Sequence, residues 1–93
     1  MLLEDDAIVL FQGDSVTDAG SDYTDETDLG TGYPMMAASY FSATYPEKGV
    51  KFINKGISGN RVRDLKERWT TDCIDRKPTW VSILIGINDC WRR

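Results

Sequence analysis

No histidine occurs among the 93 residues, and cysteine occurs only twice. The side chain that most often serves as a general base near neutral pH is therefore missing. Cys73 and Cys90 show neither a CxxC pattern nor the spacing of metal ligands. This pattern argues against a cysteine-based metal site and favours two reduced, partly buried thiols.

Long hydrophobic runs are also missing. The longest purely apolar run, at 7–11, is far too short to cross a bilayer. A positively charged signal-peptide region is lacking as well, because Glu4, Asp5 and Asp6 stand near the N-terminus. We therefore expect a single small cytoplasmic domain that does not engage a membrane.

Lysine and arginine are absent from residues 1–47, which carry ten acidic residues, whereas residues 48–93 carry eleven basic and five acidic ones. In one folded domain the two halves come together, so this asymmetry predicts ion pairs within the chain rather than a basic patch. The net charge of −4 also opposes binding to phosphate backbones. No nucleic-acid partner is expected.

Three short apolar segments predict strands, at 7–12, 50–54 and 80–85. The third is the most apolar and lies between Pro78 and Gly86, as is typical of a central parallel strand that is covered on both faces.

Two helices are predicted between these strands. The first begins after Thr31 or Gly32, with Pro34 in its first turn. The residues expected on its buried face are Met36, Ala37, Tyr40 and Phe41. The second begins after Asn60 as N-cap. Its expected buried stripe comprises Val62, Leu65, Trp69 and Cys73.

Alternating strands and helices predict an α/β fold with a parallel sheet, in the strand order 2-1-3. Each predicted strand ends in a polar loop that contains glycine, at 13–15, 56–60 and 86–89. Sites in open α/β sheets form beyond the carboxyl ends of strands. The three loops should therefore converge on one crevice.

One residue of each loop is a candidate for chemistry. Ser15 follows the first strand, where its hydroxyl can be an exposed nucleophile or merely a helix N-cap. Gly59 can point a backbone N–H outward as an oxyanion donor or serve only as a turn residue. Asn88 offers a side-chain amide, with a turn or cap residue as the alternative.

The segments GDSVTD (13–18), NKGISGN (54–60) and GIND (86–89) together resemble the first three motif blocks of the SGNH, or GDSL-type, hydrolases. The match extends over most of the chain, from Ala7 to Arg93. The stretches KGISGNRVRDLKERW and KPTWVSILIGINDCWRR are most similar to bacterial carbohydrate esterases of the acetylxylan-esterase kind.

The resemblance implies a flavodoxin-like three-layer α/β/α fold and the hydrolysis of small acyl esters without a metal or organic cofactor. Ser15 would be the nucleophile. The oxyanion hole would comprise the backbone N–H groups of Ser15 and Gly59 and the side-chain amide of Asn88. An acetylated sugar is the expected substrate.

One departure from the family is serious. Its base is a histidine, preceded three residues earlier by an aspartate, near the end of a longer chain. We therefore interpret residues 1–93 as the N-terminal half of a single SGNH hydrolase domain, inactive alone. Asp14, Asp18 or Asp89 would be a poor replacement, because a solvated carboxylate has a pKa of about 4.

Two other interpretations stay open. The chain can be a non-catalytic binding or assembly module on the same scaffold. A phosphate- or nucleotide-binding domain is disfavoured, because no GxGxxG or Walker pattern follows a strand. Tyr33 and Trp91 can either line a wall for a sugar or pack inside the domain.

Nothing in the sequence supplies a neighbour for the far edge of the third strand. Val81, Ile83 and Ile85 would flank a row of unpaired backbone groups there. We therefore expect a homo-oligomer that forms through this edge, most simply by a two-fold antiparallel pairing.

Overall fold

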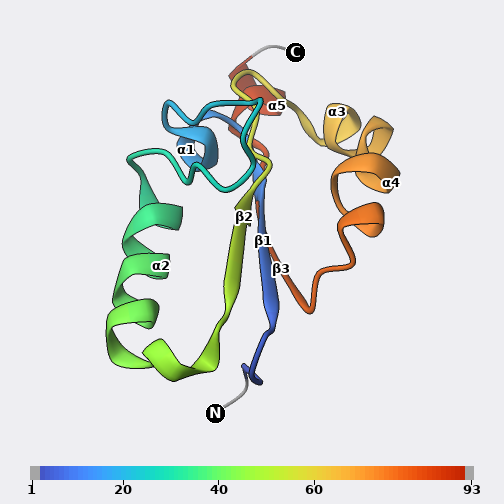
Figure 1. The fold of residues 1–93 in the computed structure, drawn as a ribbon. Coiled ribbons are helices and arrows are strands. Elements are labelled where there is room, and N and C mark those ends of the chain that lie inside the picture. The colour runs from blue at the N-terminus through green and yellow to red at the C-terminus, as the bar shows by residue number, and fades with distance from the viewer. Residues whose placement is uncertain (1–2, 92–93) are drawn as a thin grey trace.

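The computed structural model describes residues 3–91, which form a parallel sheet with helices on both of its faces (Figure 1). The strands are β1 (Ile8–Gly13), β2 (Lys51–Asn54) and β3 (Trp80–Leu84). Their order is β2-β1-β3 and both pairings are parallel. The α/β class and the strand order predicted from the sequence are thus confirmed.

The helices and turns of the described chain lie between these strands and after them. They are α1 (Ser15–Asp18), α2 (Tyr33–Thr44), η1 (Pro46–Lys48), α3 (Val62–Glu67), α4 (Trp69–Asp72), η2 (Ile74–Arg76) and α5 (Ile87–Trp91). Within residues 3–91, no helix combines the length and the apolar character that a membrane span requires.

The register of the sheet brings the carboxyl ends of all three strands to one edge. Phe11 pairs with Asn54 of β2 and with Ser82 of β3, and Gly13 pairs with Leu84. Because the strands run in the same direction, the loops that follow them leave the sheet on the same side. In Figure 1, α1 and α5 both lie at that end.

Helix α2 covers the face of the sheet that carries Phe11 and Phe52. The ring of Phe41 packs against Phe52 at 6.0 Å between centroids, and Tyr33 meets Phe11 edge-on at 5.8 Å. Gly32 is the N-cap, as predicted.

The predicted buried face of α2 is wrong. Pro34 and Ala38 are buried and Phe41 is half-buried, whereas Met36, Ala37 and Tyr40 are exposed. Apolar residues occur all round this helix, so their spacing does not select a face. The aromatic contacts with the sheet select it instead.

The opposite face of the sheet carries Leu10 and Ile53, which form a cluster with buried Cys73 and half-buried Trp69. The predicted second helix is divided into α3, α4 and η2, and it breaks at Arg68. Two other details differ from the prediction: the N-cap is Arg61 rather than Asn60, and Val62 is exposed. The Asp64 carboxylate accepts the Arg61 N–H at 2.8 Å. That bond sets the start of α3 one residue later.

Both cysteines are free thiols. Cys73 is buried, and this burial raises the pKa of its thiol above 9.0. Cys90 is exposed, so the expectation of partial burial is wrong for that residue.

Ion pairs connect the acidic and basic halves of the chain, as the charge asymmetry predicts. Lys48 lies 3.4 Å from Asp5, and Glu26 lies 2.8 Å from Arg76 and 3.9 Å from Lys55. Since such pairs are partly exposed, each contributes little to stability. They fix which acidic segment lies beside which basic one.

Strand β3 is not covered on both faces, contrary to the prediction. Successive side chains of a strand point to opposite faces, yet Trp80, Val81, Ile83 and Leu84 are all exposed, Ile83 to 53%. The described aromatic and aliphatic contacts of the helices are with β1 and β2. Within residues 3–91, β3 is an edge strand with apolar side chains on both faces.

We expect the chain to self-associate through β3, because an exposed apolar edge strand pairs readily with another chain. Sedimentation velocity at micromolar concentration should show a dimer or larger species. Ile83→Lys should shift the population to monomer, since a charge on an edge opposes pairing. Met36→Lys, at an exposed position of α2, is the matched control and should change nothing. A wild-type chain that sediments as a monomer would contradict this expectation.

Candidate active site

Hydrogen bonds connect the three loops that follow the strands. The backbone N–H of Ile57 donates to the carbonyl of Gly13 at 3.1 Å, which joins the loop after β2 to the end of β1. The side-chain amide of Asn88 donates to the carbonyl of Asn60 at 3.0 Å. This second bond joins the loop after β3 to the loop after β2. The predicted convergence of the loops is therefore present.

Ser15 is exposed and is the first residue of α1. The N-cap is Asp14, whose carboxylate accepts the N–H of Val16 at 3.1 Å, so Ser15 is not the cap residue. A residue at the first position of a helix has a backbone N–H that no carbonyl of its own helix accepts. Both the hydroxyl and that N–H therefore lie at the end of the sheet where the loops meet.

Gly59 occupies the third position of a tight turn, which the N–H of Asn60 closes on the carbonyl of Ile57 at 3.2 Å. Its φ of +82° is typical of that position in a type II turn. Residues other than glycine rarely adopt this conformation. The turn thus requires glycine at position 59. Whether Gly59 is also an oxyanion donor depends on where its N–H points.

Asn88 is the second residue of α5, but its described side-chain bond is with a different loop. The amide nitrogen carries two hydrogens, and Asn60 accepts one of them. Among the described residues, the second hydrogen has no acceptor. This contact favours a role in joining or binding over a purely local turn or cap.

The three carboxylates near the site accept hydrogen bonds from groups other than Ser15. Besides the contact of Asp14 with Val16, Asp18 accepts from Ser21 and Tyr23, and Asp89 accepts the N–H of Val62 at 3.1 Å. Within residues 3–91, none of the three carboxylates is described as a partner of the Ser15 hydroxyl. That none of them replaces a histidine base stays a prediction.

Arg68 was missed by the sequence reasoning. Its guanidinium donates to the carbonyls of Gly13 at 3.2 Å and Lys55 at 2.7 Å, which end β1 and β2. It also donates to the side chains of Gln12, Asn60 and Asp72. A signal existed: Arg68 lies three residues after Leu65, on the inward face of the predicted helix.

Two buried amides, also missed, connect the strand ends to their surroundings. Gln12 is fully buried and donates to the carbonyl of Asp72 at 2.7 Å. Asn54 donates to the carbonyls of Thr17 and Leu29 and accepts the N–H of Gly56. Gln12 directly precedes Gly13 at the end of one apolar segment, and Asn54 lies two residues before Gly56 at the end of another. This placement is the only sequence signal for the two amides.

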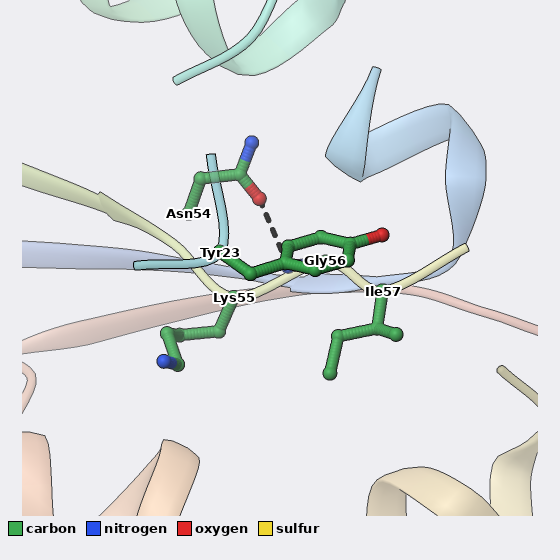
Figure 2. Close-up of a pocket in the computed structure, with 5 residues that line it drawn as sticks. All are labelled: Tyr23, Asn54, Lys55, Gly56 and Ile57. Carbon is green, nitrogen blue, oxygen red and sulfur yellow. Dashed lines mark hydrogen bonds between the residues drawn. The ribbon is translucent and has the colours of Figure 1, made fainter. Parts of the chain in front are cut away.

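Tyr23 lies over the segment that follows β2. It lines a pocket of about 120 Å³ together with Asn54, Lys55, Gly56 and Ile57, and Figure 2 shows its ring beside that segment. Partial burial and the neighbouring Asp18 carboxylate raise the pKa of Tyr23 above 10.0, although a hydrogen bond from Ser58 opposes this shift. The hydroxyl is therefore protonated at neutral pH.

Tyr33 is a packing residue. Its hydroxyl shares a hydrogen bond of 2.7 Å with Thr17, and its ring meets Phe11. The interpretation of Tyr33 as part of a sugar-binding wall thus has no support. The side chain of Trp91, the other candidate, lies outside the described part of the structure.

Comparisons with known proteins identify relatives of this chain. The sequence profile of the GDSL-like lipase/acylhydrolase family matches residues 11–93. An acetylxylan esterase from Geobacillus stearothermophilus is 53% identical over a match that covers 91% of this chain and 41% of that protein. The crystal structure of Axe2, an acetylxylan esterase from the same organism, has a TM-score of 0.94 at 50% identity, over 99% of this chain and 44% of Axe2.

A second solved structure is similar. LAE5, an alpha/beta hydrolase enzyme from the metagenome of Lake Arreo, Spain, has a TM-score of 0.91 at 38% identity, over 96% of this chain and 43% of LAE5. The chain thus spans less than half the length of each relative. Solved structures of Axe2 include catalytic mutants in which a serine, an aspartate or a histidine is replaced by alanine.

We expect Arg68→Met to lower the free energy of unfolding by about 3 kcal/mol, because the carbonyls of Gly13 and Lys55 and the carboxylate of Asp72 would each lose a charged donor. Urea unfolding at fixed protein concentration measures this change. Arg63→Met, at an exposed position of α3, is the matched control and should stay within about 0.5 kcal/mol of the wild type. Equal effects of the two substitutions would show that the contacts of Arg68 do not matter.

Proposed function

Because the chain belongs to the GDSL-like lipase/acylhydrolase family, we propose that it carries the nucleophile and the oxyanion hole of a serine esterase. The substrates would be small acetyl esters on carbohydrate. The observation that carries the proposal is the position of Ser15, exposed at the start of α1 and beside the loops that the Ile57–Gly13 and Asn88–Asn60 bonds connect.

In the proposed reaction, the Ser15 hydroxyl oxygen attacks the ester carbonyl carbon, and its proton passes to a general base. The N–H groups of Ser15 and Gly59 and the Asn88 amide donate hydrogen bonds to the carbonyl oxygen and stabilise the negative charge that develops on it. The C–O bond to the sugar then breaks, and the sugar oxygen leaves with the proton from the base. Water hydrolyses the acetyl-Ser15 ester by the same steps.

The general base is not one of these residues. The chain contains no histidine, whereas a catalytic mutant of Axe2 lacks its histidine and another lacks an aspartate three positions earlier. We infer that an Asp-x-x-His segment of this kind completes the site in a longer polypeptide, of which residues 1–93 supply the N-terminal half. We further infer that residues 1–93 are inactive by themselves.

The substrate class rests on the acetylxylan esterase relatives. An oxyanion hole of this design recognises the ester carbonyl rather than the sugar, so it serves any small acyl group that fits. Because the chain contains no histidine, a second candidate function is a binding module that retains the crevice but does not catalyse hydrolysis.

The proposal is tested by two forms of the protein. Residues 1–93 alone should hydrolyse an acetyl ester far more slowly than about 1 per second, although the oxyanion hole alone can still exceed water about a thousandfold. A fusion of residues 1–93 to the part of Axe2 that they do not match should turn over at about 1 per second or faster. Acetylated xylo-oligosaccharide is the probe.

Ser15→Ala should abolish the activity of the fusion, whereas Ser42→Ala, at an exposed position of α2, should leave it unchanged. A folded fusion that binds the acetylated sugar without hydrolysing it would overturn the esterase proposal in favour of the binding module. Fast, Ser15-dependent turnover by residues 1–93 alone would show that the chain has a base of its own.

Asn88→Ala tests the oxyanion hole separately. In the fusion, it should lower kcat by about a hundredfold to a thousandfold with little change in KM, because the lost donor acts mainly in the transition state. Cys90→Ala, in the same helix and exposed, is the control. An unchanged kcat in Asn88→Ala would remove Asn88 from the proposed site.

A further inference from the structure

Tyr23 makes two hydrogen bonds that connect elements on either side of the candidate site. Its hydroxyl lies 2.7 Å from the Asp18 carboxylate and 3.0 Å from the backbone nitrogen of Ser58. A phenol has a single proton, a carboxylate accepts, and a backbone N–H donates. The directions are therefore fixed: Tyr23 donates to Asp18 and accepts from Ser58.

The Asp18 end of this bridge is rigid. Asp18 is the last residue of α1, the helix that begins at Ser15, and it is buried. Its other carboxylate oxygen accepts the N–H and the hydroxyl of Ser21, at 3.1 and 2.7 Å. A Cβ atom added to Gly56 would lie 2.6 Å from the Asp18 nitrogen. The loop after β2 therefore packs directly on α1 at this point.

The Ser58 end lies in the turn that carries Gly59. Ser58 and Gly59 are the two central residues of that turn, which is closed by the Asn60–Ile57 bond. The Gly59 N–H belongs to the peptide that directly follows Ser58, so a displacement of Ser58 also displaces that N–H.

We infer that Tyr23 is a positioning residue of the oxyanion hole. Its hydroxyl holds the N–H of Ser58 and donates to Asp18 of α1, and so fixes where the turn that carries the Gly59 N–H lies relative to Ser15. This role rests on the function proposed above. Tyr23 does not touch the reacting atoms; it ties the turn of Gly59 to the helix of Ser15 through Asp18.

Two measurements test this role, amide exchange on residues 1–93 and modification of Ser15 in the fusion described above, which supplies the base. The first is amide hydrogen exchange at Ser58, which reports the contact without any activity. Tyr23→Phe removes only the hydroxyl, and it should accelerate exchange at Ser58 about fivefold to tenfold more than at Leu10 of the core. The second is the rate at which a fluorophosphonate modifies Ser15, a reaction that also places negative charge in the oxyanion hole. Tyr23→Phe should slow it about tenfold.

Tyr40→Phe is the matched control, because Tyr40 is exposed on α2, and it should alter neither rate. Equal acceleration of exchange at Ser58 and Leu10 would overturn the inference, because Tyr23 would then contribute only to general stability. Unchanged exchange at Ser58 would overturn it too, because the hydroxyl would then not hold the turn. Faster exchange at Ser58 with an unchanged modification rate would overturn it as well. A Ser15 that the reagent does not modify in the folded fusion, while exchange at Ser58 behaves as expected, would overturn the proposed function, and the positioning role of Tyr23 in it.

Discussion

The guanidinium of Arg68 is the group on which the arrangement of the strand ends depends. The carbonyls of Gly13 and Lys55 lie at the end of β1 and just after β2, and Arg68 donates to both, while Gly13 also accepts the N–H of Ile57. Its side chain is only 15% exposed and is paired with Asp72 at 3.1 Å. A partly buried charge of this kind is tolerated because each of its three nitrogens donates to at least one acceptor.

The polar contacts continue outward from Arg68. Gln12 and Asn54 are buried amides in a domain with a small core, and each uses both its oxygen and its nitrogen in hydrogen bonds. Buried polar groups that are fully paired specify one geometry, whereas apolar side chains of similar size tolerate several. The apolar core thus determines that the sheet forms, and these amides determine where each loop leaves it.

The sequence was sufficient for the strands and for the convergence of the loops that follow them, because strands 7–12, 50–54 and 80–85 are apolar segments bounded by proline or glycine. It was insufficient for the helices. The face of α2 is selected by rings on the sheet, and the Arg68 side chain is held by carbonyls at the ends of two strands. Tyr23, too, stands in a segment whose composition predicts only a solvated loop. Contacts of this kind join residues far apart in sequence, and no local pattern encodes them.

The proposed site needs oxyanion donors and a general base, and the contacts that position the donors lie within this chain. The bonds that position the candidate donors (Ile57 with Gly13, Asn88 with Asn60, Tyr23 with Ser58) all join residues within 3–91. None of them uses a histidine. Stabilisation of a developing oxyanion depends on donors that are fixed before reaction, whereas proton transfer depends on one base of suitable pKa. Under the proposed roles, residues 3–91 supply the fixed donors but not the base. Loss of the base would then lower the rate without disturbing the geometry that recognises the ester carbonyl.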